Sequence, residues 1–145
     1  MTIPKIINKG EWIDLYIPRY GDVEIKKGEL KLIGLGIAMK LPDGFEALIV
    51  PRSSTAKNFK ILLANSIGII DNSYSGNNDE WKFNAYAIED TYVKNNERIC
   101  QFRIQLSQKA NIWQKLRWLF TSGIELTEVE TLDDTDRGGF GTTGK

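Results

Sequence analysis

The last ten residues (136–145) combine flexible glycines with side chains of the kinds that bind nucleotides. The candidate binding residues are Arg137, Phe140, Gly141, Thr142 and Thr143. Arginine pairs with phosphate oxygens, a phenyl ring stacks on a base, and threonine hydroxyls with glycine N–H groups bind further phosphate. A segment so rich in glycine buries too little surface to hold itself in place. We therefore predict a flexible arm that orders over a nucleotide; a solvated chain end is the alternative.

A second candidate site is Pro51-Arg52-Ser53-Ser54, where a predicted strand runs into a predicted helix. Exposed N–H groups and the helix dipole favour an anion at such a junction. Arg52 and Ser53 would complete a phosphate cradle. The alternative is an ordinary serine N-cap.

The segment Gly68–Gly76 is typical of a tight hairpin that carries a carboxylate, Asp71, and an aromatic ring, Tyr74. Asp71 follows two β-branched residues, so it could lie on a pocket wall with limited solvent and act as a base for water. Alternatively, the aspartate only forms a turn and Tyr74 packs flat.

Three further polar residues stand near predicted strands. Asp14 is one acid among apolar neighbours and could orient an arginine or a metal-bound water, or simply close a turn. Arg98 begins a strand that places Gln101 on its polar face, although Arg98 could equally form a weak surface pair with Glu97.

Composition limits the chemistry. The 145 residues include 19 lysines and arginines against 19 acids, one cysteine and no histidine. This balance argues against a nucleic-acid partner and a polybasic membrane anchor, and no apolar run could span a membrane. The lone cysteine fits a reducing cytoplasm, where we expect a soluble domain. Without histidine the base must be a carboxylate, and any metal must be oxygen-bound, such as Mg²⁺.

Short β-type runs separated by turn signals must position these residues, and they predict an all-β sandwich or jelly-roll barrel over residues 1–135. The predicted strands are Val23–Lys26, Leu35–Leu41, Phe45–Val50, Lys60–Leu63, Trp81–Ile88, Thr91–Val93, Arg98–Leu106 and Ile124–Glu130. Two helices are predicted, Ser53–Asn58 and an insertion at Asn111–Thr121.

The insertion places four apolar residues on one face, with Asn111 as a cap and Gly123 as a stop. These residues are Ile112, Leu116, Leu119 and Phe120. We expect this face to pack on the barrel, and a membrane-surface or partner-binding helix is the alternative.

Taken in order, five segments resemble the motifs of the trimeric deoxyuridine triphosphate pyrophosphatases (dUTPases), most of all the branch of bacilli and their phages. The segments are Trp12-Ile13-Asp14-Leu15, Pro51–Ser54, Gly68–Gly76, Glu97–Gln101 and Arg137–Gly144. The resemblance implies a β-rich jelly roll, a homotrimer with shared active sites, and Mg²⁺-dependent hydrolysis of dUTP to dUMP and pyrophosphate.

On the nucleoside side, the resemblance implies that Asp71 activates the water that attacks the α-phosphorus. Tyr74 would lie beneath the deoxyribose and exclude a 2′-hydroxyl. Asn65 would read uracil together with backbone groups of the hairpin at Gly68 and Ile70.

On the phosphate side, the resemblance implies that the second motif (Ser53 and Ser54) and Gln101 hold phosphates, while Arg52 and Arg98 support that site and the subunit contact. Asp14 would bind Mg²⁺ indirectly, through water, or orient an arginine. In the arm, Phe140 would cover the uracil, Arg137 would meet the γ-phosphate, and Gly141, Thr142 and Thr143 would wrap the terminal phosphates.

Two alternatives remain open within this resemblance. A dCTP deaminase shares the fold but uses a glutamate near the third motif, whereas Asp71 followed by Tyr74 favours the dUTPase. A phage regulator that binds a host repressor is the other, because the inserted helix offers a place for a protein partner to dock.

Overall fold

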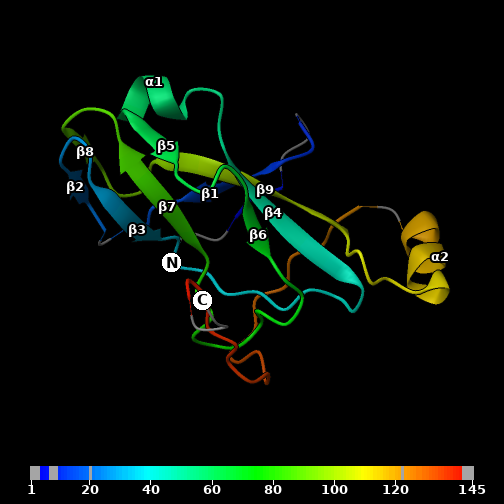
Figure 1. Ribbon diagram of the computed structural model, residues 1–145. Helices are drawn as coiled ribbons and strands as arrows, with labels where there is room; N and C mark the ends of the chain where they lie inside the picture. Colours follow the sequence, from blue (N-terminus) through cyan, green and yellow to red (C-terminus); the bar gives the residue numbers. More distant parts are fainter. Residues whose placement is uncertain (1–3, 7–9, 20, 122, 142–145) are drawn as a thin grey trace.

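The computed structural model describes residues 4–6, 10–19, 21–121 and 123–141. Within this part the chain forms short strands and two helices (Figure 1). The elements are β1 (Ile13–Tyr16), β2 (Val23–Ile25), β3 (Leu30–Gly34), β4 (Phe45–Pro51), α1 (Thr55–Phe59), β5 (Ile61–Leu63), β6 (Gly68–Ile70), β7 (Lys82–Ala87), β8 (Thr91–Val93), β9 (Arg98–Leu106) and α2 (Ile112–Phe120).

The strands form three antiparallel sheets. The largest has the order β1-β9-β4-β6, and the others are β3-β7-β5 and β2-β8. Strand β9 is central, because it pairs with β1 along one edge and with all of β4 along the other. Strand β6 is an edge strand, so one of its edges is unpaired within the sheet. The predicted all-β fold is confirmed.

The core lies between the two larger sheets. Buried side chains alternate with more accessible ones along β4 and β7, as the period of two predicts, whereas β9 has two buried neighbours, Ile99 and Cys100, near its start. Trp81 and Phe102 meet edge to face at a centroid distance of 5.2 Å, and both are fully buried. This contact joins the residue just before β7 to the middle of β9.

The predicted strand Leu35–Leu41 is wrong. Gly36 has a φ of +67°, which an extended strand does not adopt. Its N–H donates a hydrogen bond to the Glu80 carboxylate at 2.9 Å. Leu35, Ile37 and Leu41 are buried, and two backbone hydrogen bonds join Leu35 and Ile37 to Trp81, but the segment does not continue as a strand. Strands β1 and β3, in contrast, were not among the predicted strands.

The predicted strand Ile124–Glu130 is also wrong. Ile124 and Leu126 pack partly against the core, but Val129 is 54% exposed. An alternating sequence becomes a strand only when a neighbour supplies the hydrogen-bonding ladder. In the described part of the chain this segment forms no strand, and it runs as coil between α2 and the arm (Figure 1).

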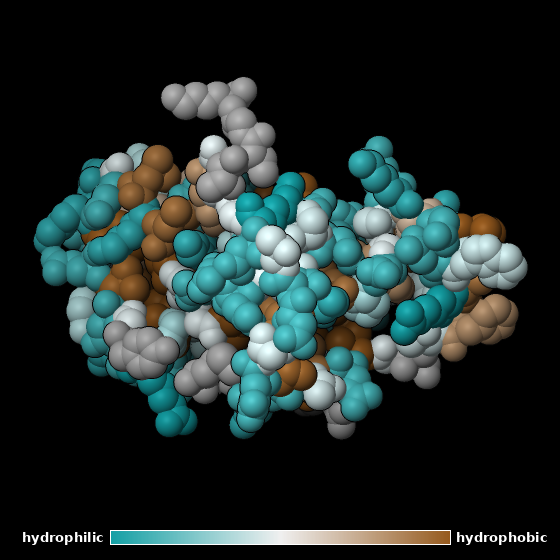
Figure 2. Space-filling view, turned by 90° about the horizontal axis from the view of Figure 1, so that it is seen from below, coloured by the Kyte–Doolittle hydropathy of each residue, from teal (hydrophilic) through white to brown (hydrophobic). Residues whose placement is uncertain are grey.

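Helix α2 forms where predicted, but its predicted packing is wrong. Asn111 caps it in a complete capping box with Gln114. The expected packing face instead points largely to solvent: Ile112 is 62%, Leu119 73% and Phe120 87% exposed. The helix protrudes from the body (Figure 1), and hydrophobic side chains gather at that end of the molecule (Figure 2, right).

None of the described helices has the combination of length and apolar content that a membrane span requires.

Candidate active site

One group of predicted residues meets at the end of the largest sheet where β4 stops. The Asp14 carboxylate contacts two arginines there: Oδ1 lies 2.9 Å from Arg52 Nε and Oδ2 lies 3.1 Å from Arg98 Nη1. Gln101 stands opposite Asp14 in the register and also pairs with Val50 of β4. We call these residues, with Ser53, the arginine end. Two cations on one carboxylate leave a net positive site that suits phosphate.

The Pro51–Ser54 segment is anchored by a residue that the sequence reasoning missed. The Thr55 hydroxyl is fully buried, donates to the carbonyl oxygen of Ile99 at 2.7 Å, and accepts from Arg52 N–H at 2.9 Å. Ser54 is the N-cap residue of α1 but makes no side-chain cap hydrogen bond, and Ser53 is exposed. The simple serine cap is therefore not what the structure contains, and both hydroxyls remain available to a ligand.

Asp71 lies in a second place, on the loop that follows β6. We call residues 71–74 the Asp71 loop. The loop is a turn, closed by Tyr74 N–H donating to the Asp71 carbonyl oxygen at 2.9 Å. The predicted hairpin Gly68–Gly76 is wrong, because β6 pairs with β4 and belongs to another sheet than β5. Asp71 is exposed, so the expected limited solvent at this residue is wrong too.

The Asp71 carboxylate is held by Ser73. Its Oδ1 accepts hydrogen bonds from the Ser73 hydroxyl and from Ser73 N–H, the latter at 3.0 Å. These two bonds lower the pKa of Asp71 below its ordinary value, partial burial opposes them, and the positive charges of Arg137 and Lys109 lower it further. The carboxylate is therefore ionised at neutral pH, and its Oδ2 atom keeps no hydrogen bond within the described residues.

The residues predicted to read the nucleoside flank this loop. Tyr74 is 8% exposed, and its hydroxyl donates to the carbonyl oxygen of Glu80 at 2.8 Å. Asn65 lies exposed in the β5–β6 connection, with Nδ2 3.3 Å from the carbonyl oxygen of Ile67. Gly68 and Ile70 begin and end the edge strand β6, so this strand offers unpaired backbone groups beside Asp71.

The arginine end and the Asp71 loop stand at opposite ends of β4. Ile70 pairs with Ala47 near the start of β4, whereas Pro51 at its end pairs with Cys100. Asp71 is thus level with Glu46, six residues from Arg52, which is about 20 Å along an extended strand. One chain does not bring these two groups together.

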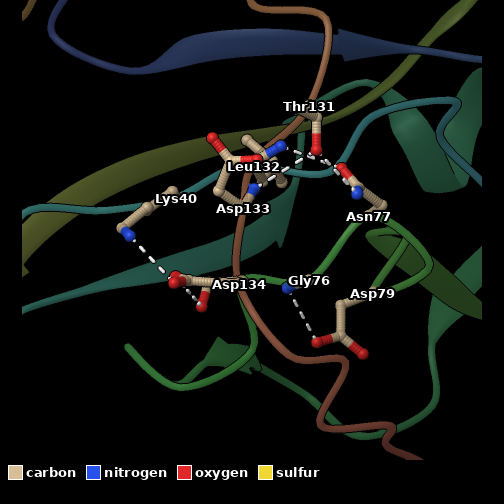
Figure 3. A network of polar contacts seen from close by, with 9 residues as sticks. Lys40, Gly76, Asn77, Asp79, Thr131, Leu132, Asp133 and Asp134 are labelled. Carbon is tan, nitrogen blue, oxygen red and sulfur yellow. Dashed lines mark hydrogen bonds and ion pairs between the residues drawn. The ribbon is translucent and has the colours of Figure 1, made fainter.

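The arm begins beside the Asp71 loop, where polar contacts tie residues 131–138 to the turn at 75–79 (Figure 3). Asn77 bonds to Thr131 and to Leu132 N–H, at 3.0 and 2.9 Å. Asp134 accepts from Lys40 and from the Ser75 hydroxyl, both at 2.9 Å. These contacts join segments more than fifty positions apart in the sequence.

Asp79 is the centre of this attachment, and the sequence reasoning missed it. Its carboxylate is 1% exposed and accepts from the N–H groups of Gly76, Arg137 and Gly138 at 3.0, 2.7 and 2.8 Å. Burial acts to raise the pKa of Asp79, but these N–H groups and that of Ser75 together hold it below its ordinary value. Its signal in the sequence was weak, because Asn77-Asn78-Asp79-Glu80 resembles any polar turn.

The predicted arm residues lie near the Asp71 loop as far as they are described. Arg137 is exposed, Gly139 backs on the Tyr74 ring, and Phe140 is 55% exposed, with Lys82 Nζ 5.9 Å from its ring centre. Gly141 is exposed with a φ of +107°, which favours glycine. Thr142 and Thr143 lie outside the described residues.

Comparison with known proteins identifies the chain. The family model described as dUTPase matches residues 13–144. The SPbeta prophage-derived deoxyuridine 5′-triphosphate nucleotidohydrolase of Bacillus subtilis is 49% identical over 138 residues, which are 95% of this chain and 87% of that protein. The chain belongs to the dUTPase family. A second dUTPase-family relative, the deoxyuridine 5′-triphosphate nucleotidohydrolase of Nautilia profundicola, is 40% identical over 86% of this chain and 78% of its own length.

Solved dUTPase structures share the fold. The dUTPase of Streptococcus mutans superposes with a TM-score of 0.67 at 21% identity, over 75% of this chain and 88% of that one. The Staphylococcus bacteriophage 80alpha dUTPase, solved as a G164S mutant with dUpNHpp, gives a TM-score of 0.59 at 17% identity, over 99% and 92% of the two chains. The predicted jelly-roll fold of the dUTPase family is confirmed.

Proposed function

We propose that this protein hydrolyses dUTP to dUMP and pyrophosphate, in active sites shared between the chains of a homotrimer. The observation that carries the proposal is the Asp71 loop: an ionised carboxylate keeps one oxygen free beside a buried tyrosine and an open strand edge, in a chain of the dUTPase family. Oδ2 of Asp71 takes a proton from the water that attacks the α-phosphorus. Because a carboxylate of lowered pKa is a weak base, most of the acceleration comes from positioning and charge neutralisation.

The edge strand β6 and Tyr74 select the nucleoside. Unpaired backbone groups at Gly68 and Ile70, with the amide of Asn65, supply the kinds of donor and acceptor that uracil requires. Tyr74 cannot yield to a 2′-hydroxyl, because its ring is buried and its own hydroxyl is held by Glu80. Phe140 of the arm then covers the base.

The arginine end holds the phosphates. Ser53, Ser54 and Gln101 donate to the α- and β-phosphates, while Arg52 and Arg98 are kept in place by Asp14. Arg137, Gly141, Thr142 and Thr143 close over the terminal phosphates. Closing the arm excludes water and fixes the triphosphate for in-line attack.

Mg²⁺ fits this site as an ion carried by the triphosphate. No group of three or more acidic, histidine or cysteine side chains that could hold a metal occurs within the described ranges, and both oxygens of Asp14 are occupied by arginines. Asp14 would therefore reach the ion only through water. When bound, Mg²⁺ neutralises phosphate charge. A phage phi11 dUTPase of the same fold is described with a structural Mg(II) ion.

The separation of the two halves of the site supports the homotrimer, which is the assembly that the family resemblance implies. A chain whose general base and phosphate-binding residues lie about 20 Å apart needs the Asp71 loop of one copy beside the arginine end of another.

The test is the variant Asp71→Asn, which keeps the shape of the side chain and removes its basicity. We expect pyrophosphate release from dUTP to fall by about 10²–10⁴-fold, with Glu89→Gln on an exposed turn as the control that stays active. Near-normal turnover of Asp71→Asn would show the assignment of the base to be wrong. Assays on dUTP, dTTP, dCTP and UTP, with and without Mg²⁺, test specificity; ammonia release from dCTP would indicate the deaminase instead.

A second candidate function is binding of a protein partner such as a host repressor. The observation that favours it is the exposure of Trp113 (75%) and Phe120 (87%) on α2. A phage 80alpha dUTPase of the same fold is described in connection with a capacity to induce SaPI. Loss of repressor capture in Trp113→Ser/Phe120→Ser, with turnover of dUTP unchanged, would support this role.

A further inference from the structure

Helix α2 has no part in the proposed reaction, yet its contacts lead to the general base. The helix meets the body at the turn Pro42–Phe45, just before β4. Trp118 packs on Phe45 with a centroid distance of 5.3 Å and an angle of 42°. Gln114 lies so close to Gly44 that a Cβ on this glycine would stand 2.6 Å from Gln114 Cδ.

The same turn holds the neighbour of Asp71. Asn72 Nδ2 donates to the carbonyl oxygen of Pro42 at 2.8 Å and to that of Phe45 at 2.9 Å. The side chain of Asn72 therefore uses both of its N–H donors on the turn that carries α2 on its other side. The segment leading into α2 holds the turn too, since Ser107 N–H donates to the Gly44 carbonyl oxygen at 2.8 Å.

We propose that α2 positions the catalytic carboxylate: the helix clamps the Pro42–Phe45 turn against Asn72 and so fixes the direction in which Asp71 points. This inference rests on the proposed function of Asp71. Asn72 and Trp118 are positioning residues, because neither touches the nucleotide.

The anchoring of the Asp71 loop shows why such a clamp matters. Ser73 bonds to Asp71 within the loop, so it moves with the loop and cannot fix its direction. Two links connect the loop to the body: the Tyr74 hydroxyl on Glu80 at one end, and Asn72 on the Pro42–Phe45 turn at the other. A shift of about 1 Å in a reacting group costs up to 10²-fold in rate. Loosening the link through Asn72 would therefore be enough to slow the reaction measurably.

The experiment compares two tryptophans of one helix. Trp118→Ala removes the contact with Phe45, whereas Trp113→Ala removes a ring that is 75% exposed. We expect kcat for dUTP to fall about 10- to 100-fold in Trp118→Ala, with KM little changed, and no change in Trp113→Ala. Trp118→Phe keeps an aromatic contact and should recover most of kcat.

Asn72→Asp is the second variant, because it keeps the shape of the side chain and removes both donors. It should lower kcat as Trp118→Ala does. In Trp118→Ala the acid limb of the pH–rate profile should stay in place, because the bonds from Ser73 to Asp71 remain. Asn72→Asp is judged on kcat alone, because its new carboxylate stands beside Asp71 and raises the pKa of that residue.

Three results would overturn the inference. The first is equal kcat in Trp118→Ala and Trp113→Ala. The second is a loss in Trp118→Ala that matches a smaller fraction of folded sites, counted by titration with a non-hydrolysable dUTP analogue. The third is unchanged kcat in Asn72→Asp. If instead Asp71→Asn itself stays active, the proposed function fails. That outcome is distinguishable from failure of the inference on α2, which is tested by the comparison of Trp118→Ala with Trp113→Ala.

Discussion

The two oxygens of the Asp71 carboxylate have different surroundings. Oδ1 accepts both hydrogen bonds from Ser73, whereas Oδ2 accepts none within the described chain. Ser73 therefore does two things at once: it occupies Oδ1, which leaves Oδ2 as the oxygen open to water, and it keeps the carboxylate ionised. The second effect weakens Asp71 as a base, which is tolerable when positioning supplies most of the rate.

Ser73→Ala tests this division of roles. Hydrogen bonds to the ionised form lower the pKa of Asp71, so loss of the hydroxyl should raise it. Because the ionised form is the active one, the acid limb of kcat/KM for dUTP should move to higher pH. Ser73→Thr keeps the hydroxyl and should leave the limb where it is. An acid limb that stays put in Ser73→Ala would contradict the assignment.

At the scale of elements, hydrogen bonds to Asp79 fix the place in the fold from which the glycine-rich arm extends. Asp79 gathers N–H groups from the turn at 76 and from the arm at 137–138. Because this carboxylate is buried, its ionised form is favoured only while those donors stay in place. The arm is thus rooted beside the Asp71 loop by its backbone, which leaves the side chain of Arg137 and the residues after Gly138 to close over a nucleotide.

We expect Asp79→Asn to loosen the root of the arm. It replaces a charged acceptor by a weaker one and places an amide against N–H donors, at a cost of about 1–3 kcal/mol. Amide exchange at Arg137 and Gly138 should become faster and dUTP turnover should fall. Asp133→Asn, on the exposed side of the same segment, is the control. Unchanged exchange at these two amides would refute the attachment.

The pH dependence of this attachment follows from the lowered pKa of Asp79. A carboxyl whose pKa is lower in the folded chain stabilises it fully above the ordinary aspartate pKa. The contribution is lost as the pH falls through the lowered, folded value. Wild-type protection of the two arm amides should therefore persist at neutral pH and decline only in acid, while Asp79→Asn should lack this acid dependence.

At the scale of the whole molecule, the halves of the proposed site lie at opposite ends of β4. Asp71 follows the strand paired with its start, and Arg52 follows its end. A head-to-tail contact that closes after three copies would join each Asp71 loop to a neighbouring arginine end. Neither half would be active alone.

Mixing two inactive variants tests this arrangement. Asp71→Asn inactivates the Asp71 loop of its chain, and Gln101→Ala inactivates the arginine end of its chain. In a mixture, an intact loop of one variant can meet an intact arginine end of the other. If sites form between chains, co-refolding the two variants should restore activity in about a quarter of the sites by random assortment. Either variant refolded alone is the control. No recovery in the mixture, or a molecular mass of single chains in solution, would refute the shared site.

The sequence by itself determined what depends on near neighbours. Strand β9 lies where it was predicted and β7 lies within the predicted Trp81–Ile88, because the period of two in these runs records which side of a strand is buried. Asn111 caps α2 as predicted, since a cap bonds within one turn. The order of the motifs was enough for the family and its jelly roll.

Only the tertiary structure decided what depends on distant partners. Ile124–Glu130 alternates like a strand but has no ladder beside it, and α2 turns Trp118, not its predicted face, to the body. Asp14 meets Arg52, which follows β4, and Arg98 of β9, and Asp79 collects donors from a segment nearly sixty residues away. Periodicity shows which face of a helix or strand is apolar. Which element packs or pairs with that face depends on how the whole chain folds.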